Sequence, residues 1–240
     1  MLLAAVAGAI LGSFLATLVV RWPAGRSLGG RSACDECGKP IGALSLIPLL
    51  SYAVARGRCA DCNAPIDPVH PIMELASAVL AGFAFAVLPL TVAPWVGGAS
   101  LLLLTLALLD LRHFWLPDRL TLSLAGLGLL AASSGAPGIA DRLVGLVAGW
   151  ASLVLVALAY RRVRGREGLG AGDGKLFGAI GAWTGWQILP FILLGASVLG
   201  LAVAAAMLVA GRRVAATTRL PFGTLLAAAA LPAIYWTALH

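Results

Sequence analysis

Four cysteines are the first residues in the chain whose type and spacing could do chemistry. They form two Cys-x-x-Cys pairs, Cys34 with Cys37 and Cys59 with Cys62, and a turn signal follows each pair. Four thiolates can close a tetrahedral metal site, because each pair supplies two sulfurs from one tight turn. The spacing therefore predicts a structural metal site of the zinc-ribbon type, with Zn²⁺ as the expected ion.

The same four cysteines have two other interpretations. Paired thiols also serve membrane thiol oxidoreductases, and four free cysteines in a loop are the simplest alternative. The charge pattern described below places this segment in the reducing cytoplasm, which argues against disulfide transfer. A segment of about 50 residues has a weak core of its own, so a bound metal would supply much of its folding free energy.

Two aspartates form a second candidate site. Asp110 ends an unbroken apolar run that begins at Leu101, and Asp173 follows three small residues at 170–172. An ionisable residue at a membrane boundary is a functional candidate. Two facing carboxylates can share one proton, so that one acts as a base toward water and the other as an acid toward a carbonyl. This chemistry is aspartyl peptide hydrolysis without a metal, and the glycines beside Asp173 would admit an extended substrate.

The acidic residues near span ends also have structural interpretations. Asp110 could be a solvated helix end, and Asp173 could be the N-cap of the helix that follows it. Asp118 follows Pro117 and precedes an apolar run, so we expect it to be a helix N-cap. Glu74 is expected either to be buried and paired with a base or to line a substrate path.

The composition indicates that membrane helices position these groups. The chain has 240 residues, of which 60% are hydrophobic and 11% are charged, and its mean hydropathy is +0.97. Soluble domains carry about 25% charged residues, and a globule of this size could not hide so much apolar surface. These values exclude a soluble enzyme, a disordered chain and a nucleic-acid-binding module, although the pI is about 9.9.

Stretches without Asp, Glu, Lys or Arg mark the candidate membrane spans, each of which needs about 20 apolar residues. They occur at residues 1–20, 75–109, 120–140, 143–160, 176–211 and 220–239. The two longest contain Pro89, Pro94 and Pro190, so each is expected to form two antiparallel helices. The sequence therefore predicts an all-α polytopic membrane protein with about eight transmembrane helices.

The basic residues predict the orientation of these spans. With eight spans, all but one of the 17 Lys and Arg residues fall on one side, and Arg142 is the exception. That side is expected to be cytoplasmic. It would hold the four-cysteine segment at about 21–70, Asp110 and Asp173, while both termini face outward. No basic region precedes the first apolar run, so the first span is expected to be permanent rather than a cleaved signal peptide.

Together these motifs resemble the type IV prepilin peptidases, the GxGD-type aspartyl membrane proteases of bacteria. Segments along nearly the whole chain carry the resemblance: 12–15, 21–23, 47–52, 56–59, 62–66, 71–75, 110–112, 116–118, 167–176 and 220–223. The resemblance implies that Asp110 and Asp173 are the catalytic pair. The candidate supporting residues are Gly170, Gly172, Lys175, Glu74 and Asp118.

The resemblance also implies a substrate and a second activity. The expected reaction is removal of the basic leader of prepilins and pseudopilins after a Gly, at the cytoplasmic face of the bacterial inner membrane. Many members then methylate the new N-terminus with S-adenosylmethionine, an activity tied to the N-terminal half. Gly57 and Arg58 are the methyltransferase candidates. The expected partners are these substrates and the lipid bilayer, without nucleic acid.

Two positions depart from the family pattern in that N-terminal half. Ala16 and Leu46 stand where the family usually has Asn, so a peptidase that has lost methylation is one alternative. A proton-coupled transporter with Asp110 as its carrier site is another. We expect two domains: residues 1–89, with the first span, the cysteine segment and the second span, and residues 90–240, the aspartyl peptidase domain.

Overall fold

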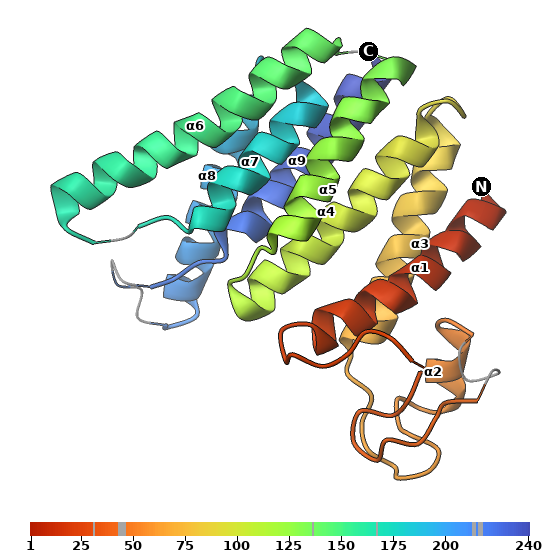
Figure 1. Ribbon diagram of the computed structural model, residues 1–240. Helices are drawn as coiled ribbons and strands as arrows, with labels where there is room; N and C mark the ends of the chain where they lie inside the picture. Colours follow the sequence, from red (N-terminus) through yellow and green to blue (C-terminus); the bar gives the residue numbers. More distant parts are fainter. Residues whose placement is uncertain (31, 43–46, 136, 167, 213–214, 216–217) are drawn as a thin grey trace. The chain divides into compact units, whose positions relative to one another are not determined.

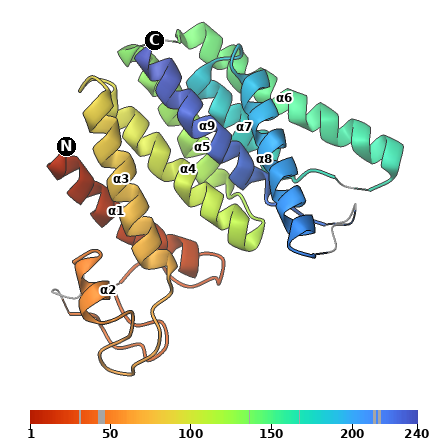
Figure 2. The same cartoon turned by 180° about the vertical axis from the view of Figure 1, so that it is seen from behind.

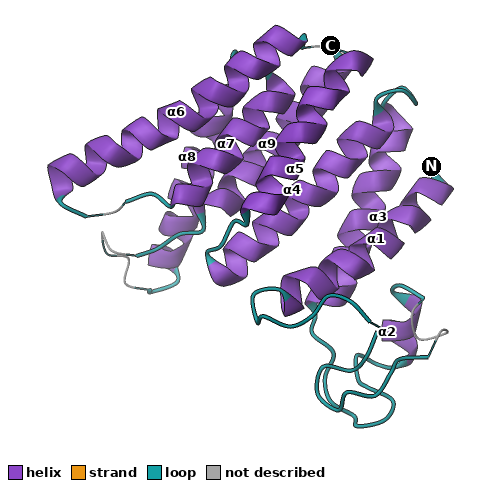
Figure 3. Ribbon diagram, in the orientation of Figure 1, coloured by secondary structure: helices purple, strands orange, loops and turns teal. Residues whose placement is uncertain are grey.

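The computed structural model describes residues 1–240 except 31, 43–46, 136, 167, 213–214 and 216–217 (Figure 1). The described chain is helical, and Figure 3 shows no strand in it. The helices are α1 (Leu2–Arg21), α2 (Leu50–Val54), α3 (Val69–Val87), α4 (Ala93–His113), α5 (Asp118–Leu130), α6 (Ile139–Arg164), α7 (Ala171–Thr184), α8 (Leu189–Val209) and α9 (Phe222–Leu239). The prediction of an all-α fold is confirmed.

Six of the described helices are long and apolar enough to cross a membrane, namely α1, α3, α4, α6, α8 and α9. The chain is therefore a multi-pass membrane protein. Helices α5 and α7 have 13 and 14 residues. They are roughly 20 Å long, which is shorter than the hydrocarbon core of about 30 Å. The predicted apolar stretches all contain helices, but the count of eight spans stays a prediction.

Proline and glycine divide the two long apolar stretches. Pro89 lies in the break between α3 and α4, and Pro94 lies in the first turn of α4. Gly185 ends α7 with a φ of +71°, and Pro190 lies in the first turn of α8. Proline is tolerated there because the N–H groups of a first turn have no partner within the helix.

The described chain divides into two compact units, Met1–Val87 and Leu88–His240. In the first unit, α1 packs closely against α3 through small residues. A Cβ on Gly8 would lie 2.5 Å from the carbonyl oxygen of Ser77, and one on Gly12 would lie 2.7 Å from that of Met73. Small residues at a crossing let two membrane helices approach closely, which explains this glycine spacing in α1.

Helix α7 is the central helix of the second unit. It packs against α5, α6 and α9, and all of its residues from Leu176 to Thr184 are buried. Figures 1 and 2 show it enclosed by these helices. Its first turn, which carries Asp173, is thus held at a defined position inside the unit.

Arg142, the exception to the charge pattern, is buried in this second unit. Its guanidinium donates to the carbonyl oxygens of Gly128 and Ala182 over 2.6 and 3.3 Å, and to that of Pro137 over 2.8 Å. It therefore joins the ends of α5 and α7. Arg142 has a structural role that the count of basic residues did not predict.

Candidate functional site

The four cysteines lie together in the first unit. Their Sγ atoms are within 4.8 Å of one another, and the Sγ atoms of Cys34 and Cys62 are 3.8 Å apart. Tetrahedral coordination with metal–sulfur bonds of about 2.3 Å would separate two sulfurs by about 3.8 Å. Cys34, Cys37, Cys59 and Cys62 could therefore hold a metal ion such as zinc.

The two cysteine pairs adopt the same turn. In each, the N–H of the first cysteine, Cys34 or Cys59, donates to the carbonyl oxygen five residues later, over 2.9 and 2.8 Å. The residues after the second cysteines, Gly38 and Asn63, have φ values of 70° and 60°. Glycine and asparagine tolerate this left-handed conformation best, which explains the turn signals of the sequence. Backbone N–H groups of Cys62 and Asp61 also lower the pKa of the Cys59 thiol to about 7, favouring the metal-binding thiolate.

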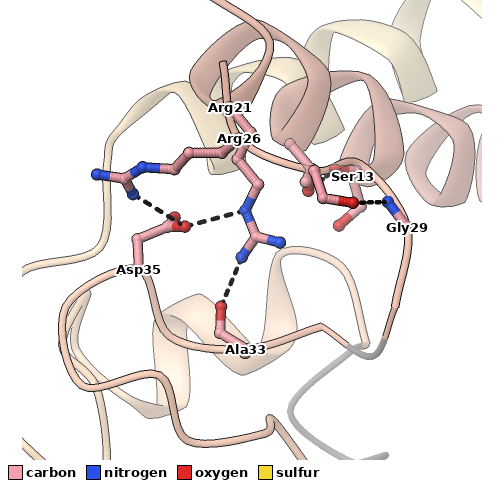
Figure 4. Close-up of polar contacts among 8 residues, drawn as sticks. Ser13, Arg21, Arg26, Gly29, Ala33 and Asp35 are labelled. Carbon is pink, nitrogen blue, oxygen red and sulfur yellow. Dashed lines mark hydrogen bonds and ion pairs between the residues drawn. The ribbon is translucent and has the colours of Figure 1, made fainter. Parts of the chain in front are cut away.

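Arg21 connects the first cysteine turn to the end of α1. Its Nε donates to Asp35 over 2.9 Å, and its Nη2 donates to the carbonyl oxygen of Ala33 over 2.8 Å. Figure 4 shows Arg21 and Arg26 converging on the Asp35 carboxylate, with Arg26 at 3.6 Å. The candidate metal site is therefore anchored to a membrane helix.

Glu74 connects the same segment to α3. It is buried, and its Oε2 accepts the backbone N–H of Leu49 over 2.8 Å. It is buried, as one of the two expectations had it, and its hydrogen-bond partner in the described chain is backbone, so pairing with a base stays a prediction. Ala16, the first departure from the family pattern, is fully buried in α1. Leu46, the second, lies outside the described residues.

The two methyltransferase candidates both shape the second cysteine turn. Gly57 has a φ of +69°, and a Cβ there would lie 2.9 Å from the hydroxyl oxygen of Tyr52. The Nη1 of Arg58 donates to the carbonyl oxygen of Asn63 over 3.3 Å. These contacts explain both residue types by local structure.

Asp110 is buried near the end of α4, against the first turn of α9. Its Oδ2 accepts the backbone N–H of Thr224 over 2.7 Å. The Thr224 hydroxyl lies 3.3 Å from the same oxygen and 2.8 Å from the carbonyl oxygen of Ala107, to which it donates. A helix N-terminus stabilises a negative charge, so α9 favours the carboxylate form of Asp110.

Asp173 lies in the first turn of α7, outside the six candidate spans. Its Oδ2 accepts the N–H of Gly170 over 3.0 Å, and its own N–H donates to the Gly170 carbonyl oxygen over 3.1 Å. The N-cap is therefore Gly170, so the interpretation of Asp173 as the N-cap is wrong. Burial raises the pKa of Asp173 to about 6, and the nearby charge of Asp110 adds to this rise. The two carboxyl groups are thus close enough to interact electrostatically.

Leu116 packs between the two aspartate-bearing segments. A Cβ on Gly172 would lie 2.9 Å from the Cβ of Leu116. A Cβ on Gly223 would lie 2.8 Å from Leu116 Cδ1 and 3.0 Å from Asp110 Oδ2. Any side chain at either glycine would displace Leu116, so both positions require glycine for the observed packing.

Lys175 and Asp118 form an ion pair beside these groups. The Nζ of Lys175 lies 2.7 and 2.8 Å from the two carboxylate oxygens of Asp118. Helix α5 begins at Asp118, and Pro117 occupies the N-cap position. The expectation that Asp118 is an N-cap is therefore wrong, because its side chain reaches across to α7 instead.

Sequence reasoning missed three residues of these sites. Thr224 follows the 220–223 segment directly, and the start of the last apolar run could have placed a helix N-terminus there. Leu116 lies within a recognised motif but was not singled out, because its role depends on packing. Arg21 lies in the recognised segment 21–23 and is the first basic residue after the first span, but neither signal indicated its contacts with the first cysteine turn.

Two family models match the chain. The Bacterial Peptidase A24 N-terminal domain matches residues 6–88, and the Type IV leader peptidase family matches residues 97–205. No solved structure gives a significant match.

Curated relatives cover most of the chain. It is 40% identical over 210 residues to the prepilin leader peptidase/N-methyltransferase of Pseudomonas aeruginosa, covering 85% of this chain and 71% of that protein. The Aeromonas hydrophila protein of the same name is 40% identical over 212 residues, with 86% and 71% covered. The one from Pseudomonas putida is 35% identical over 268 residues, with 98% and 90% covered.

Proposed function

This chain belongs to the type IV leader peptidase family, and we propose that it is a membrane-embedded aspartyl endopeptidase that removes the leaders of prepilins and pseudopilins. The observation that carries the proposal is the pair of buried carboxyl groups, Asp110 and Asp173. Each has one oxygen held by a backbone N–H at a helix N-terminus. This arrangement presents two carboxyl groups whose charges interact.

The proposed mechanism uses one ionised and one protonated carboxyl group, because two neighbouring carboxyl groups rarely ionise together. We assign the base to Asp110, whose charge the α9 N-terminus stabilises, and the acid to Asp173, whose protonated form burial favours. Asp110 takes a proton from water, and the water oxygen attacks the carbonyl carbon of the scissile bond. Asp173 donates its proton to the carbonyl oxygen. The resulting diol then breaks the C–N bond: protonated Asp110 gives its proton to the leaving amine, and a diol hydroxyl returns a proton to Asp173.

The proposed substrate follows from the family. Cleavage would come directly after a Gly, between a basic leader in the cytoplasm and an apolar helix in the bilayer. The expectation that the glycines beside Asp173 admit an extended peptide gains no support from the packing, because Leu116 occupies the space beside Gly172. We place the protein in the bacterial inner membrane, with both aspartates and the cysteine segment on the cytoplasmic side.

We propose that the four cysteines bind a structural Zn²⁺. The sulfur positions fit tetrahedral coordination, as described above. Bound metal would order the two cysteine turns and, through Arg21 and Glu74, the polar segment between α1 and α3. It has no proposed role in peptide cleavage.

We propose N-methylation of the new N-terminus as the second activity, because the curated relatives carry this activity in their names. S-adenosylmethionine would supply the methyl group. The contacts of Gly57 and Arg58 in the second cysteine turn explain these residue types without a cofactor, so they carry no argument for a contact with S-adenosylmethionine. We therefore assign no residue of the chain to the methyl-transfer step.

The experiment is a cleavage assay on a purified prepilin in detergent, read by product mass. Asp110→Asn and Asp173→Asn should each lower cleavage by at least about a hundredfold while the protein stays folded. Asp141→Asn is the matched control, because Asp141 lies beside Gly185 at the other end of α7. Near-normal cleavage by either catalytic variant would show that the assigned pair is wrong.

The same assay separates the alternatives. Addition of S-adenosylmethionine should increase the product mass by one methyl group, and an unmodified product would leave a peptidase alone. No cleavage by folded wild-type protein would refute the peptidase proposal. Proton-coupled transport or mixed disulfides on the four cysteines would then be measured in its place.

A further inference from the structure

A cavity of about 300 Å³ lies between α6 and the start of α7. Its lining consists of α6 side chains between Trp150 and Arg161, together with residues 168–171 and 174–175. Figures 1 and 2 show the end of α6 diverging from α7 in this region, with the connecting segment between them. The size is at the lower end of the range for small-molecule sites, roughly 300–1,000 Å³.

The cavity opens toward the bilayer rather than only toward water. Trp150 and Leu158 line it, yet they are 49% and 50% exposed on α6, which is a candidate membrane span. Most of its other α6 lining is aliphatic, namely Leu153, Val154 and Ala157. Water has few polar partners in such a space, so hydrocarbon is the favoured content.

The length of the cavity along α6 matches one leaflet of a membrane. Trp150 and Arg161 mark its ends, and a helix of that length rises roughly 16 Å. The hydrocarbon core of a bilayer is about 30 Å thick, so one leaflet is about half of that. A single acyl chain lying along α6 would span the cavity and bring its headgroup to Arg161.

The headgroup end of the cavity is cationic. Lys175 is neutralised by Asp118, but the guanidinium of Arg161 has no hydrogen-bond or ion-pair partner within the described part of the chain. Arg162 and Arg164 add further positive charge to the last turn of α6. A guanidinium recognises phosphate through two parallel hydrogen bonds, so a phosphate group is the complementary partner.

We propose that this cavity binds one acyl chain of an anionic phospholipid, with Arg161 at its phosphate. The bound chain fills the space between α6 and residues 168–171 and so supports the backbone of Gly170. Because the N–H of Gly170 holds Asp173, the lipid stabilises the surroundings of that carboxyl group without touching it.

The test is lipid retention measured by native mass spectrometry, after reconstitution with equal phosphatidylglycerol and phosphatidylcholine. Arg161→Gln should reduce the preference of one tightly held site for phosphatidylglycerol by about tenfold, because a charge-assisted hydrogen bond is lost. Arg164→Gln is the matched control, since it removes a cation from the same turn outside the cavity lining. An unchanged preference in Arg161→Gln would overturn the proposal.

A second pair of variants tests the acyl chain. Ala157→Phe fills the cavity and should lose the held lipid, whereas Val156→Phe, at a 53% exposed position outside the lining, should retain it. Equal retention by both would overturn the proposal. If Ala157→Phe instead impaired prepilin cleavage with lipid retention unchanged, the cavity would belong to the peptide substrate. The lipid measurement needs no catalysis, so it stands or falls independently of the proposed peptidase activity.

Discussion

The backbone N–H of Thr224 donates to Oδ2 of Asp110 over 2.7 Å, so the first turn of α9 holds a carboxyl group 114 positions earlier in the chain. Gly170 holds Oδ2 of Asp173 in the same way at the start of α7. Each carboxyl group therefore has one oxygen held by a backbone N–H at the start of a helix.

The packing around Asp110 predicts that Gly223→Ala impairs cleavage. The new Cβ would lie 3.0 Å from Oδ2 of Asp110 and 2.8 Å from Leu116 Cδ1, so the carboxyl group must move. A displacement of about 1 Å can cost a hundredfold in rate, and we expect a loss of about that size in kcat. The measurement is steady-state cleavage of a prepilin.

Gly98→Ala is the matched control for this substitution. It places the same methyl group on α4, the helix that carries Asp110, but at a position with no other atoms within 4 Å. Its cleavage rate should stay close to that of the wild type. A comparable loss in Gly98→Ala, or none in Gly223→Ala, would show that the contact with Asp110 does not control the rate.

Much of the helical framework was predictable because hydropathy acts along a single segment. The uncharged stretches cover most of α1 and of α3–α9, and prolines lie at or near both breaks inside the long ones. The two cysteine turns were equally visible, since their residue types are set by local backbone conformation and by sulfur ligation. The lengths of α5 and α7 were harder to predict, because apolar residues continue beyond the ends of both helices.

Contacts across the fold were not predictable. Asp118 has the sequence context of an N-cap, but its carboxylate forms an ion pair with Lys175, which lies 57 positions away in the chain. Arg142 looked like an outer-loop cation, yet it is buried on the carbonyl groups that end α5 and α7. Leu116 packs between the two aspartate-bearing segments only because α4, α7 and α9 converge around it. Such pairings depend on how helices pack, which no local pattern in one sequence reports.

The ion pair of Lys175 and Asp118 predicts a charge-swap effect. The side chains are 43% and 60% exposed, so the pair should contribute less than about 1 kcal/mol to stability. Its position matters more, because it joins the first turn of α7 to the start of α5. Lys175→Asp should lower kcat/KM about tenfold by repulsion from Asp118, with little change in melting temperature. Lys175→Asp combined with Asp118→Lys should restore most of the activity, and failure to do so would exclude the pair as a positioning contact.

The environment of Asp173 predicts a pH-dependent stability difference. Its pKa is raised from 3.8 to about 6, first by burial and then by the charge of Asp110. The folded protein holds this proton more tightly than the unfolded chain, so wild-type stability should fall as pH rises from about 4 to about 6. Asp173→Asn has no charge to bury and can still accept the N–H of Gly170. The melting temperature of Asp173→Asn should be higher than that of the wild type at about pH 7, and the two melting temperatures should be equal below about pH 4. A difference in melting temperature that does not depend on pH would contradict this prediction.

Metal removal should disorder the cysteine segment and leave the second unit folded. The segment has little core of its own, so loss of the metal removes much of its folding free energy. Cys34→Ser, or a chelator, should expose residues 33–66 to limited proteolysis, while α4–α9 stay protected. Prepilin cleavage, which depends on Asp110, should be reduced less than it is in Asp110→Asn. Lys39→Met is the matched control, because it removes an exposed 2.9 Å ion pair with Asp61 in the same segment and leaves all four sulfurs in place. If the control exposed the segment as fully as Cys34→Ser, the metal would not be what orders it.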